Sequence, residues 1–161
     1  MQTNINMIKL RDFQLDQVLL KLYRGLSEIE KIAFVSAFLI GFTTHLVIYT
    51  NRLFGNHDIG MVWRNYATVQ TGRWLNNFIT SINDGYILPL LVGLWISLFL
   101  ALSALYICKI LNIRKKLSAF FIGSLLTTFP SVAWTNLFIH DSANYHFGVL
   151  LAVMMNLLRM I

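Results

Sequence analysis

Hydrophobic residues gather in long runs along this chain, and short polar segments separate the runs. Three runs carry no Asp, Glu, Lys or Arg, at 32–50, 87–108 and 117–139, and a shorter fourth run covers about 147–161. A helix needs about 20 apolar residues to cross the roughly 30 Å hydrocarbon core of a bilayer. The pattern predicts an all-α fold, a polytopic bundle of about four transmembrane helices. Because the fourth run is short for a full crossing, we expect the chain to be part of a longer protein.

The composition agrees with a membrane protein. Apolar residues make up 57% of the chain and charged residues 12%, and the mean hydropathy is +0.62, unlike a typical soluble domain. The net charge of +6 would suit nucleic acid, but no basic stripe with interleaved aromatic residues occurs, so no nucleic-acid partner is expected. Cys108 is the single cysteine, which excludes an internal disulfide and predicts a buried, inert thiol.

Basic residues set the expected orientation. They precede the first run and separate the second run from the third, as Lys9, Arg11, Lys21, Arg24, Lys31, Lys109, Arg114, Lys115 and Lys116. Since Lys and Arg are enriched in cytoplasmic loops, we expect the N-terminus inside and 51–86 outside. Residues 1–31 form a cytoplasmic segment with an amphipathic helix at 15–26. This helix either lies on the inner membrane surface or packs on another cytoplasmic segment. Residues 32–161 form the transmembrane domain.

The long outer connection, 51–86, has apolar residues at helical spacing on both sides of Gly72. These residues are Ile59, Val62, Trp63, Tyr66, Trp74, Phe78 and Ile82. The spacing predicts two short amphipathic helices along the outer membrane surface, with Trp and Tyr at the level of the lipid headgroups.

Beyond the N-terminal segment, every carboxylate falls on the outer side in this topology: Asp58, Asp84 and Asp141. Asp58 follows His57 just after the first span, where partial burial would raise its pKa and suit it to act as a general base. It also precedes the helical pattern at Ile59, where an Asp caps a helix, and both roles can hold. Asp84 lies in an Asn-Asp-Gly turn, which turn chemistry alone explains.

Asp141 lies in the stretch IHDSANYH, which we expect to form a short outer loop, 140–146, between the third and fourth spans. His140 and His146 are too far apart to share one helical face, and no metal motif accompanies them. We therefore expect neither a metal site nor a cofactor, although the need for a divalent cation stays open. Arg64 and Arg73 would either grip a phosphate through paired hydrogen bonds or anchor to lipid headgroups.

Two polar features lie within the apolar runs. Thr43, Thr44 and His45 form a polar step near the outer end of the first span, and we expect His45 to bond to a neighbouring helix. Pro130 is expected to kink the third span and to free a backbone carbonyl.

Three stretches, in this order, resemble one known family: the acid after the first span, TGRWLNNFI before the second, and TFPSVAWTNLFIHDSANYHFGVLLA across the third and fourth. They resemble the bacterial and phage serotype-converting O-antigen glucosyltransferases, which belong to the polytopic, lipid-donor class called GT-C. The resemblance runs from about Ile32 to the end and covers the N-terminal portion of such enzymes. Its most specific pieces are Gly72-Arg73-Trp74, Phe129-Pro130 and the loop ending in Tyr145.

The resemblance implies an inverting enzyme, or a truncated remnant of one, multi-pass in the bacterial inner membrane. It would take glucose from polyprenyl-phosphate-glucose on the periplasmic face and add it to lipopolysaccharide O-antigen. Asp58 would deprotonate the acceptor hydroxyl, and Arg73 with Arg64 would bind the donor phosphate. The substrate-binding residues would be His57, Trp63, Trp74, Asp84, Asp141 and Tyr145.

The alternative is a small polytopic transporter or lipid-linked sugar flippase. Such a protein would place polar residues along its spans near the bilayer midplane, whereas the charged groups here lie in the outer segments. A non-catalytic partner of other membrane proteins also stays open.

Overall fold

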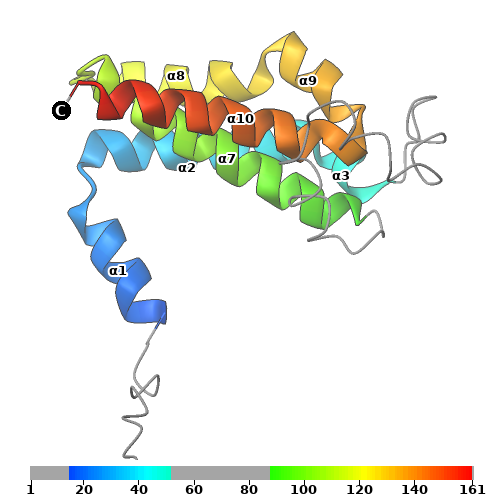
Figure 1. Cartoon of the computed structure of the whole chain (residues 1–161), viewed down its shortest axis with the longest axis horizontal. Helices are drawn as coiled ribbons and strands as arrows, with labels where there is room; N and C mark the ends of the chain where they lie inside the picture. The colour runs from blue at the N-terminus through cyan, green and yellow to red at the C-terminus, as the bar shows by residue number, and fades with distance from the viewer. Residues whose placement is uncertain (1–14, 52–87, 161) are drawn as a thin grey trace, which may run out of the picture.

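The computed structural model describes residues 15–51 and 88–160, and every regular element in these ranges is an α-helix (Figure 1). In chain order the helices are α1 (Leu15–Gly25), α2 (Glu28–Thr44), α3 (Leu46–Thr50), α7 (Pro89–Ile110), α8 (Lys116–Thr128), α9 (Pro130–Asn136) and α10 (Ile139–Leu158). The predicted all-α class is confirmed for this part of the chain.

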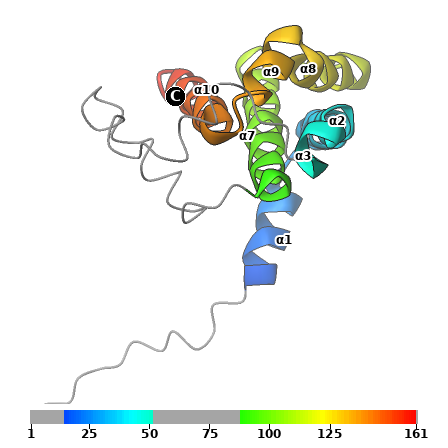
Figure 2. The ribbon, with the colours of Figure 1, turned by 90° about the vertical axis from the view of Figure 1, so that its right-hand side faces the viewer.

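Helix α7 lies at the centre of the bundle. Helix α2 packs on both α7 and α8, and α10 packs on the other side of α7 (Figure 2). Among the described helices, α7 is long and apolar enough to cross a membrane, and α8 with α9 qualifies as one bent span. One or two membrane-spanning helices are therefore supported, and the four-span bundle stays a prediction. Cys108 is buried in the core, as predicted.

Small residues bring α2 and α8 into close contact. Buried small residues recur every four positions on both helices, as Ala33, Ala37 and Gly41 on α2 and Ala119, Gly123 and Thr127 on α8. A Cβ at Gly123 would lie 2.3 Å from Ser36 Oγ and 2.6 Å from the carbonyl oxygen of Ala33. Such stripes let two helix backbones approach closely, which matters most in lipid, where van der Waals packing must hold helices together.

The third predicted span is broken at Pro130. Helix α8 ends at Thr128, Phe129 is extended (φ −61°, ψ 138°), and α9 begins at Pro130 with a bend of 42°. Proline has no N–H and disfavours helical backbone in the residue before it, so carbonyls in the last turn of α8 lack helical partners. His45 Nε2 donates to one of them, the carbonyl oxygen of Thr127, at 2.9 Å. Both predictions, the kink and the bond of His45 to a neighbouring helix, are confirmed.

The segment 140–146 is helical, and the prediction of a loop there is wrong. Helix α10 begins at Ile139, so this segment forms its first two turns. Polar residues do not by themselves end a helix, and the buried residues Ala143, His146 and Leu150 recur at helical spacing. Asp141 lies in the first turn, where a carboxylate interacts favourably with the helix dipole.

Helix α1 is the amphipathic helix expected near the N-terminus. It lies across the direction of the bundle helices (Figure 1), and its Leu22 and Tyr23 side chains are exposed. Lys31 Nζ lies 4.7 Å from the centre of the Tyr23 ring, which links α1 to the start of the bundle. The helix is thus confirmed, and its position on the membrane surface stays a prediction.

Candidate functional site

Buried polar side chains gather at one end of the bundle. Four helix termini meet there, since α3 ends at Thr50, α7 begins at Pro89, α9 ends at Asn136 and α10 begins at Ile139 (Figure 1). The polar side chains buried in this region are His45, Asn136, Asp141, Ser142 and His146. A polar group removed from water is costly unless it is hydrogen-bonded, so the bonds among these residues fix the geometry of this end.

A chain of hydrogen bonds joins α3, α9 and α10. Asn136 Nδ2 donates to Tyr49 Oη at 3.1 Å, and Asn136 Oδ1 lies 3.1 Å from His146 Nε2. Only 3% of Tyr49, 1% of Asn136 and 4% of His146 is exposed. These hydrogen bonds therefore tie the consecutive helices α9 and α10 to α3, whose Tyr49 is 87 residues from Asn136 in the sequence.

Asn136 decides the direction of each bond in this chain. Its amide nitrogen donates to Tyr49, so its amide oxygen faces His146, and an amide oxygen can only accept. His146 Nε2 must therefore carry the hydrogen. In the neutral imidazole, Nδ1 is then left as a hydrogen-bond acceptor.

Neighbouring residues hold Tyr49 in place. Its ring lies against α7 where Gly93 has no side chain, and a Cβ at Gly93 would approach Cγ of that ring to 2.3 Å. The Phe42 ring also packs against it, with its centre 5.7 Å from that of Tyr49. Tyr49 thus reaches Asn136 only because α7 offers a glycine at this level.

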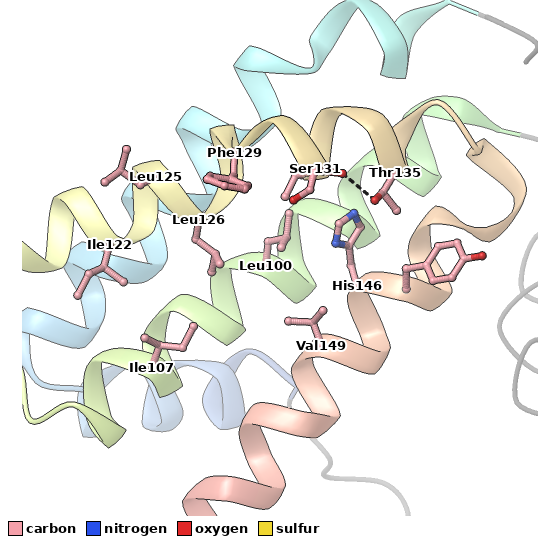
Figure 3. A pocket seen from close by; sticks show the side chains of 12 residues that line it. Leu100, Ile107, Ile122, Leu125, Leu126, Phe129, Ser131, Thr135, His146 and Val149 are labelled. Atoms are coloured by element: carbon pink, nitrogen blue, oxygen red, sulfur yellow. Dashed lines mark hydrogen bonds between the residues drawn. The ribbon is translucent and has the colours of Figure 1, made fainter.

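A groove of about 520 Å³ lies next to His146, between α7, α8, α9 and α10 (Figure 3). Its walls are mostly Leu, Ile and Val side chains, and its polar end is formed by Ser131, Thr135, Tyr145 and His146. The His146 ring points from α10 toward α9. Thr135 Oγ1 donates to the carbonyl oxygen of Ser131 at 2.7 Å. The groove is therefore apolar along its length and polar at one end.

Of the predicted site residues, the structure describes Asp141 and Tyr145. Asp141 is 7% exposed, whereas Tyr145 is 50% exposed and lines the groove beside His146. Both lie on α10 near the chain of hydrogen bonds. The remaining predicted residues lie outside the described ranges, as do the two amphipathic helices expected in 51–86: His57, Asp58, Trp63, Arg64, Arg73, Trp74 and Asp84.

Tyr49 and Asn136 are candidates that the sequence pattern did not reveal. The available signal was an Asn inside the otherwise apolar run 117–139, because a strongly polar side chain is expensive in a membrane helix.

In the part of the chain that the structure describes, no group of three or more His, Cys, Asp or Glu residues is placed to hold a metal ion.

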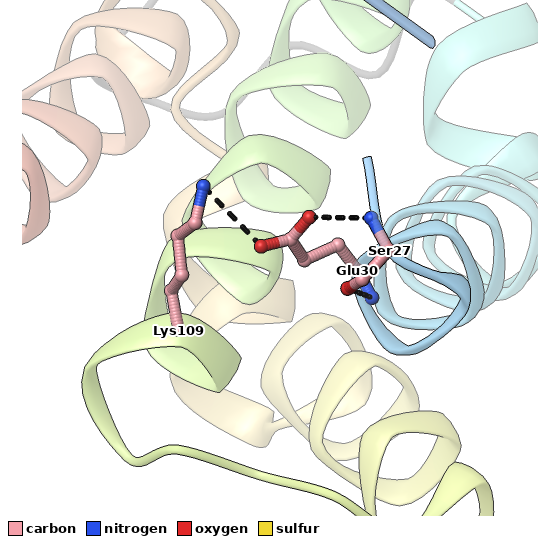
Figure 4. Close-up of polar contacts among 3 residues, drawn as sticks. All are labelled: Ser27, Glu30 and Lys109. Atoms are coloured by element: carbon pink, nitrogen blue, oxygen red, sulfur yellow. Dashed lines mark hydrogen bonds and ion pairs between the residues drawn. The ribbon is translucent and has the colours of Figure 1, made fainter. Parts of the chain in front are cut away.

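The opposite end of the bundle carries basic residues and one carboxylate cluster (Figure 4). Ser27 caps α2 by accepting from the Glu30 N–H at 3.3 Å, and the Glu30 carboxylate accepts from the Ser27 N–H at 2.8 Å. Lys109 Nζ lies 3.3 Å from the same carboxylate. Burial alone would raise the pKa of Glu30, but the Ser27 N–H and Lys109 outweigh it, so this pKa lies below its usual value. The cluster ties the start of α2 to the end of α7.

Comparison with known families gives a match over most of the chain. The model of the family described as glucosyl transferase GtrII matches residues 46–158, from the start of α3 to the end of α10. The chain belongs to the GtrII glucosyl transferase family. Membership confirms the resemblance drawn from TGRWLNNFI and the stretch across α8 to α10. Comparisons with curated proteins and with solved structures gave no match.

The family match includes most of the residues described above at the polar end, although His45 lies just before it. Tyr49, Asn136 and His146 all lie within it, as does the whole groove. Membership implies glucosyl transferase activity, which requires a sugar donor and an acceptor.

Proposed function

We propose that the chain serves in the transfer of glucose from polyprenyl-phosphate-glucose to lipopolysaccharide O-antigen, on the periplasmic face of the bacterial inner membrane. The observation that carries this proposal is the GtrII family match over residues 46–158. In the proposal, four crossings are made by α2 with α3, by α7, by α8 with α9, and by α10. Helix α10 has 20 residues, which gives about 30 Å at roughly 1.5 Å per residue.

The ends of the helices support the location of the active centre. The segment 52–87 joins α3 to α7, and both helices terminate where Asn136 and His146 are buried. The candidate acid Asp58 is thereby tethered to the polar end of the bundle. The other end carries Lys109 and the basic residues around the start of α8, and such residues favour the cytoplasmic side.

The proposed reaction is a single displacement. Asp58 accepts the proton of the acceptor hydroxyl as that oxygen bonds to the anomeric carbon of glucose. The bond from this carbon to the phosphate oxygen breaks on the opposite side, and the phosphate leaves with the electron pair, so the configuration inverts. Arg73 and Arg64 stabilise the charge on the departing lipid phosphate. Trp63 and Trp74 stack on sugar faces, and contacts to donor or acceptor come from His57, Asp84, Asp141 and Tyr145.

Asp58→Asn tests this role directly. Membrane vesicles that contain the chain are supplied with polyprenyl-phosphate-glucose carrying a labelled sugar and with lipopolysaccharide, and labelled lipopolysaccharide is measured. Because a general base contributes about 10² to 10⁴ in rate, transfer should fall at least about 100-fold. Asp16→Asn is the matched control, since Asp16 is an exposed acid on α1, and it should leave transfer unchanged.

Near-normal transfer by Asp58→Asn would show that this carboxylate only caps a helix. Movement of the intact lipid-linked sugar across the vesicle membrane, with no transfer, would instead support the transporter alternative.

A further inference from the structure

The groove beside His146 has a definite chemical polarity, and Tyr145 is the one lining residue that the displacement described above uses. From Ile122 to Thr135 it follows α8 and α9 over about 20 Å, at roughly 1.5 Å per residue. One half of a hydrocarbon core about 30 Å thick measures about 15 Å. The groove is therefore longer than one leaflet is deep.

The groove opens away from the bundle core. Leu125 and Phe129 on its α8 side are each 62% exposed, and Val149 on α10 is 42% exposed. The break at Pro130 turns α9 away from the line of α8 by 42°. In a membrane this face contacts hydrocarbon rather than water, so the hydrocarbon chains of lipids can enter the groove.

The size of the groove limits what can occupy it. The space between its walls that no atom fills is about 1070 Å³, and it extends over about 20 Å. A helix about 10 Å across would fill roughly 1,600 Å³ over that length, so a helix of a second copy does not fit within it. A single hydrocarbon chain is roughly 5 Å thick, because carbon atoms in contact lie about 4 Å apart, and its cross-section is about 20 Å².

The polar end adds a requirement for the head group. His146 Nε2 is committed to Asn136, so Nδ1 is left to accept a hydrogen bond from a ligand. A phosphate at neutral pH has few protons to donate, whereas a sugar has several hydroxyl groups. The hydroxyls of Ser131 and Thr135 lie at the same end (Figure 3).

We propose that this groove binds the long hydrocarbon chain of the lipid-linked glucose donor, with a sugar hydroxyl donating to His146 Nδ1. The inference rests on the proposed function and assigns the donor to α7, α8, α9 and α10. The chain lies along Ile122, Leu126 and Leu100, and the head group lies at the polar end. His146 is then a positioning residue that orients the sugar.

Photo-cross-linking tests the tail site without any need for turnover. The probe is polyprenyl phosphate with a diazirine in the middle of its chain and an alkyne for detection, incubated with the full chain in phosphatidylethanolamine and phosphatidylglycerol vesicles. The expected result is labelling of α8 and α10 on the groove side. Val149→Trp should reduce labelling at least about fivefold by filling the groove. Leu151→Trp is the control on the same helix, because Leu151 is also exposed but does not line the groove.

Equal labelling in both Trp variants would overturn the tail site, and so would equal labelling by a phosphatidylglycerol that carries the same diazirine. A cross-link between two copies of the chain at the groove would also contradict it. The failure of this inference is distinguishable from that of the proposed function. Glucose transfer that depends on Asp58, without groove labelling, refutes only the groove. Groove labelling with an active Asp58→Asn variant refutes only the assigned base.

Competition tests the head contact. Unlabelled polyprenyl-phosphate-glucose should displace the probe about fivefold better than polyprenyl phosphate, as expected for one hydrogen bond of typical net strength. His146→Leu should abolish this preference, and His146→Asn, whose side chain again offers an acceptor near the position of Nδ1, should restore part of it. Labelling by the probe alone reports that each variant still folds. A preference that survives in His146→Leu would remove His146 from the site.

Discussion

The hydrogen bonds of Asn136 give the sharpest stability prediction. Asn136→Leu keeps a side chain of similar size but removes both bonds, which leaves the Nε2–H of His146 buried without its acceptor and the oxygen of Tyr49 without its amide donor. Each unsatisfied buried group costs about 1 to 3 kcal/mol, whereas polar contacts in membrane proteins average nearer 0.6 kcal/mol. For two groups that are 3% and 4% exposed, we expect a loss of about 2 kcal/mol in the free energy of unfolding.

The assay is thermal unfolding of the purified chain in detergent, followed by circular dichroism. For a chain of this size, about 2 kcal/mol corresponds to a decrease in Tm of about 4 to 8 °C. Asn156→Leu is the control, because Asn156 is exposed on α10 and its amide donates only to the carbonyl oxygen of Ala152 at 2.9 Å. Its Tm should stay within about 2 °C of wild type, as for surface substitutions. Equal Tm values for the two variants would refute the reasoning. So would full additivity of Asn136→Leu with Tyr49→Phe, because both disrupt one shared bond.

Two further predictions concern packing and pH. Gly123→Ala should lower the free energy of unfolding by about 1 to 3 kcal/mol, since its Cβ would overlap Ser36. Gly148→Ala, with open space around it, should instead raise the free energy of unfolding by up to about 1 kcal/mol through helix propensity. Denaturant titration measures both variants, and a change of the same sign in both would contradict this prediction. The pKa of Glu30 in the folded state is below its ordinary value of 4.5, so its stabilisation is present above that value and is lost as pH falls through the lowered pKa. Thermal unfolding at a series of pH values should show this loss of stability at low pH in wild type but not in Glu30→Gln. Identical pH profiles of the two proteins would show that the Lys109 ion pair does not contribute this stability.

The features that local chemistry decides could be predicted from the sequence. Pro130 interrupts the helical run whatever surrounds it, because the missing N–H and the restriction on Phe129 act within a few residues. His45 needed a partner because an imidazole is costly in an apolar span, and the break at Pro130 leaves the carbonyl of Thr127 free to supply it. One hydrogen bond, from His45 to the carbonyl oxygen of Thr127, therefore confirms both predictions.

The features that depend on tertiary packing could not be predicted in this way. Asn136 gains its importance from Tyr49 and His146, which approach it only when α3 and α10 pack around α7. No spacing within 117–139 encodes that contact. The start of α10 was missed for a related reason. Its first turns are polar in sequence but are buried by neighbouring helices, so polarity indicated a loop where packing favours a helix.

The central claim is that the polar end of the bundle faces the periplasm and the basic end faces the cytoplasm. Single cysteines at exposed positions test it in a Cys108→Ala background: Asn51→Cys beside the end of α3, and Leu111→Cys between α7 and α8. Intact cells are treated with a maleimide that cannot cross the inner membrane, and labelling is compared with that of lysed cells. The account predicts that Asn51→Cys is labelled in intact cells and Leu111→Cys only after lysis. The reverse pattern would place Asp58 on the cytosolic side and contradict the proposed mechanism.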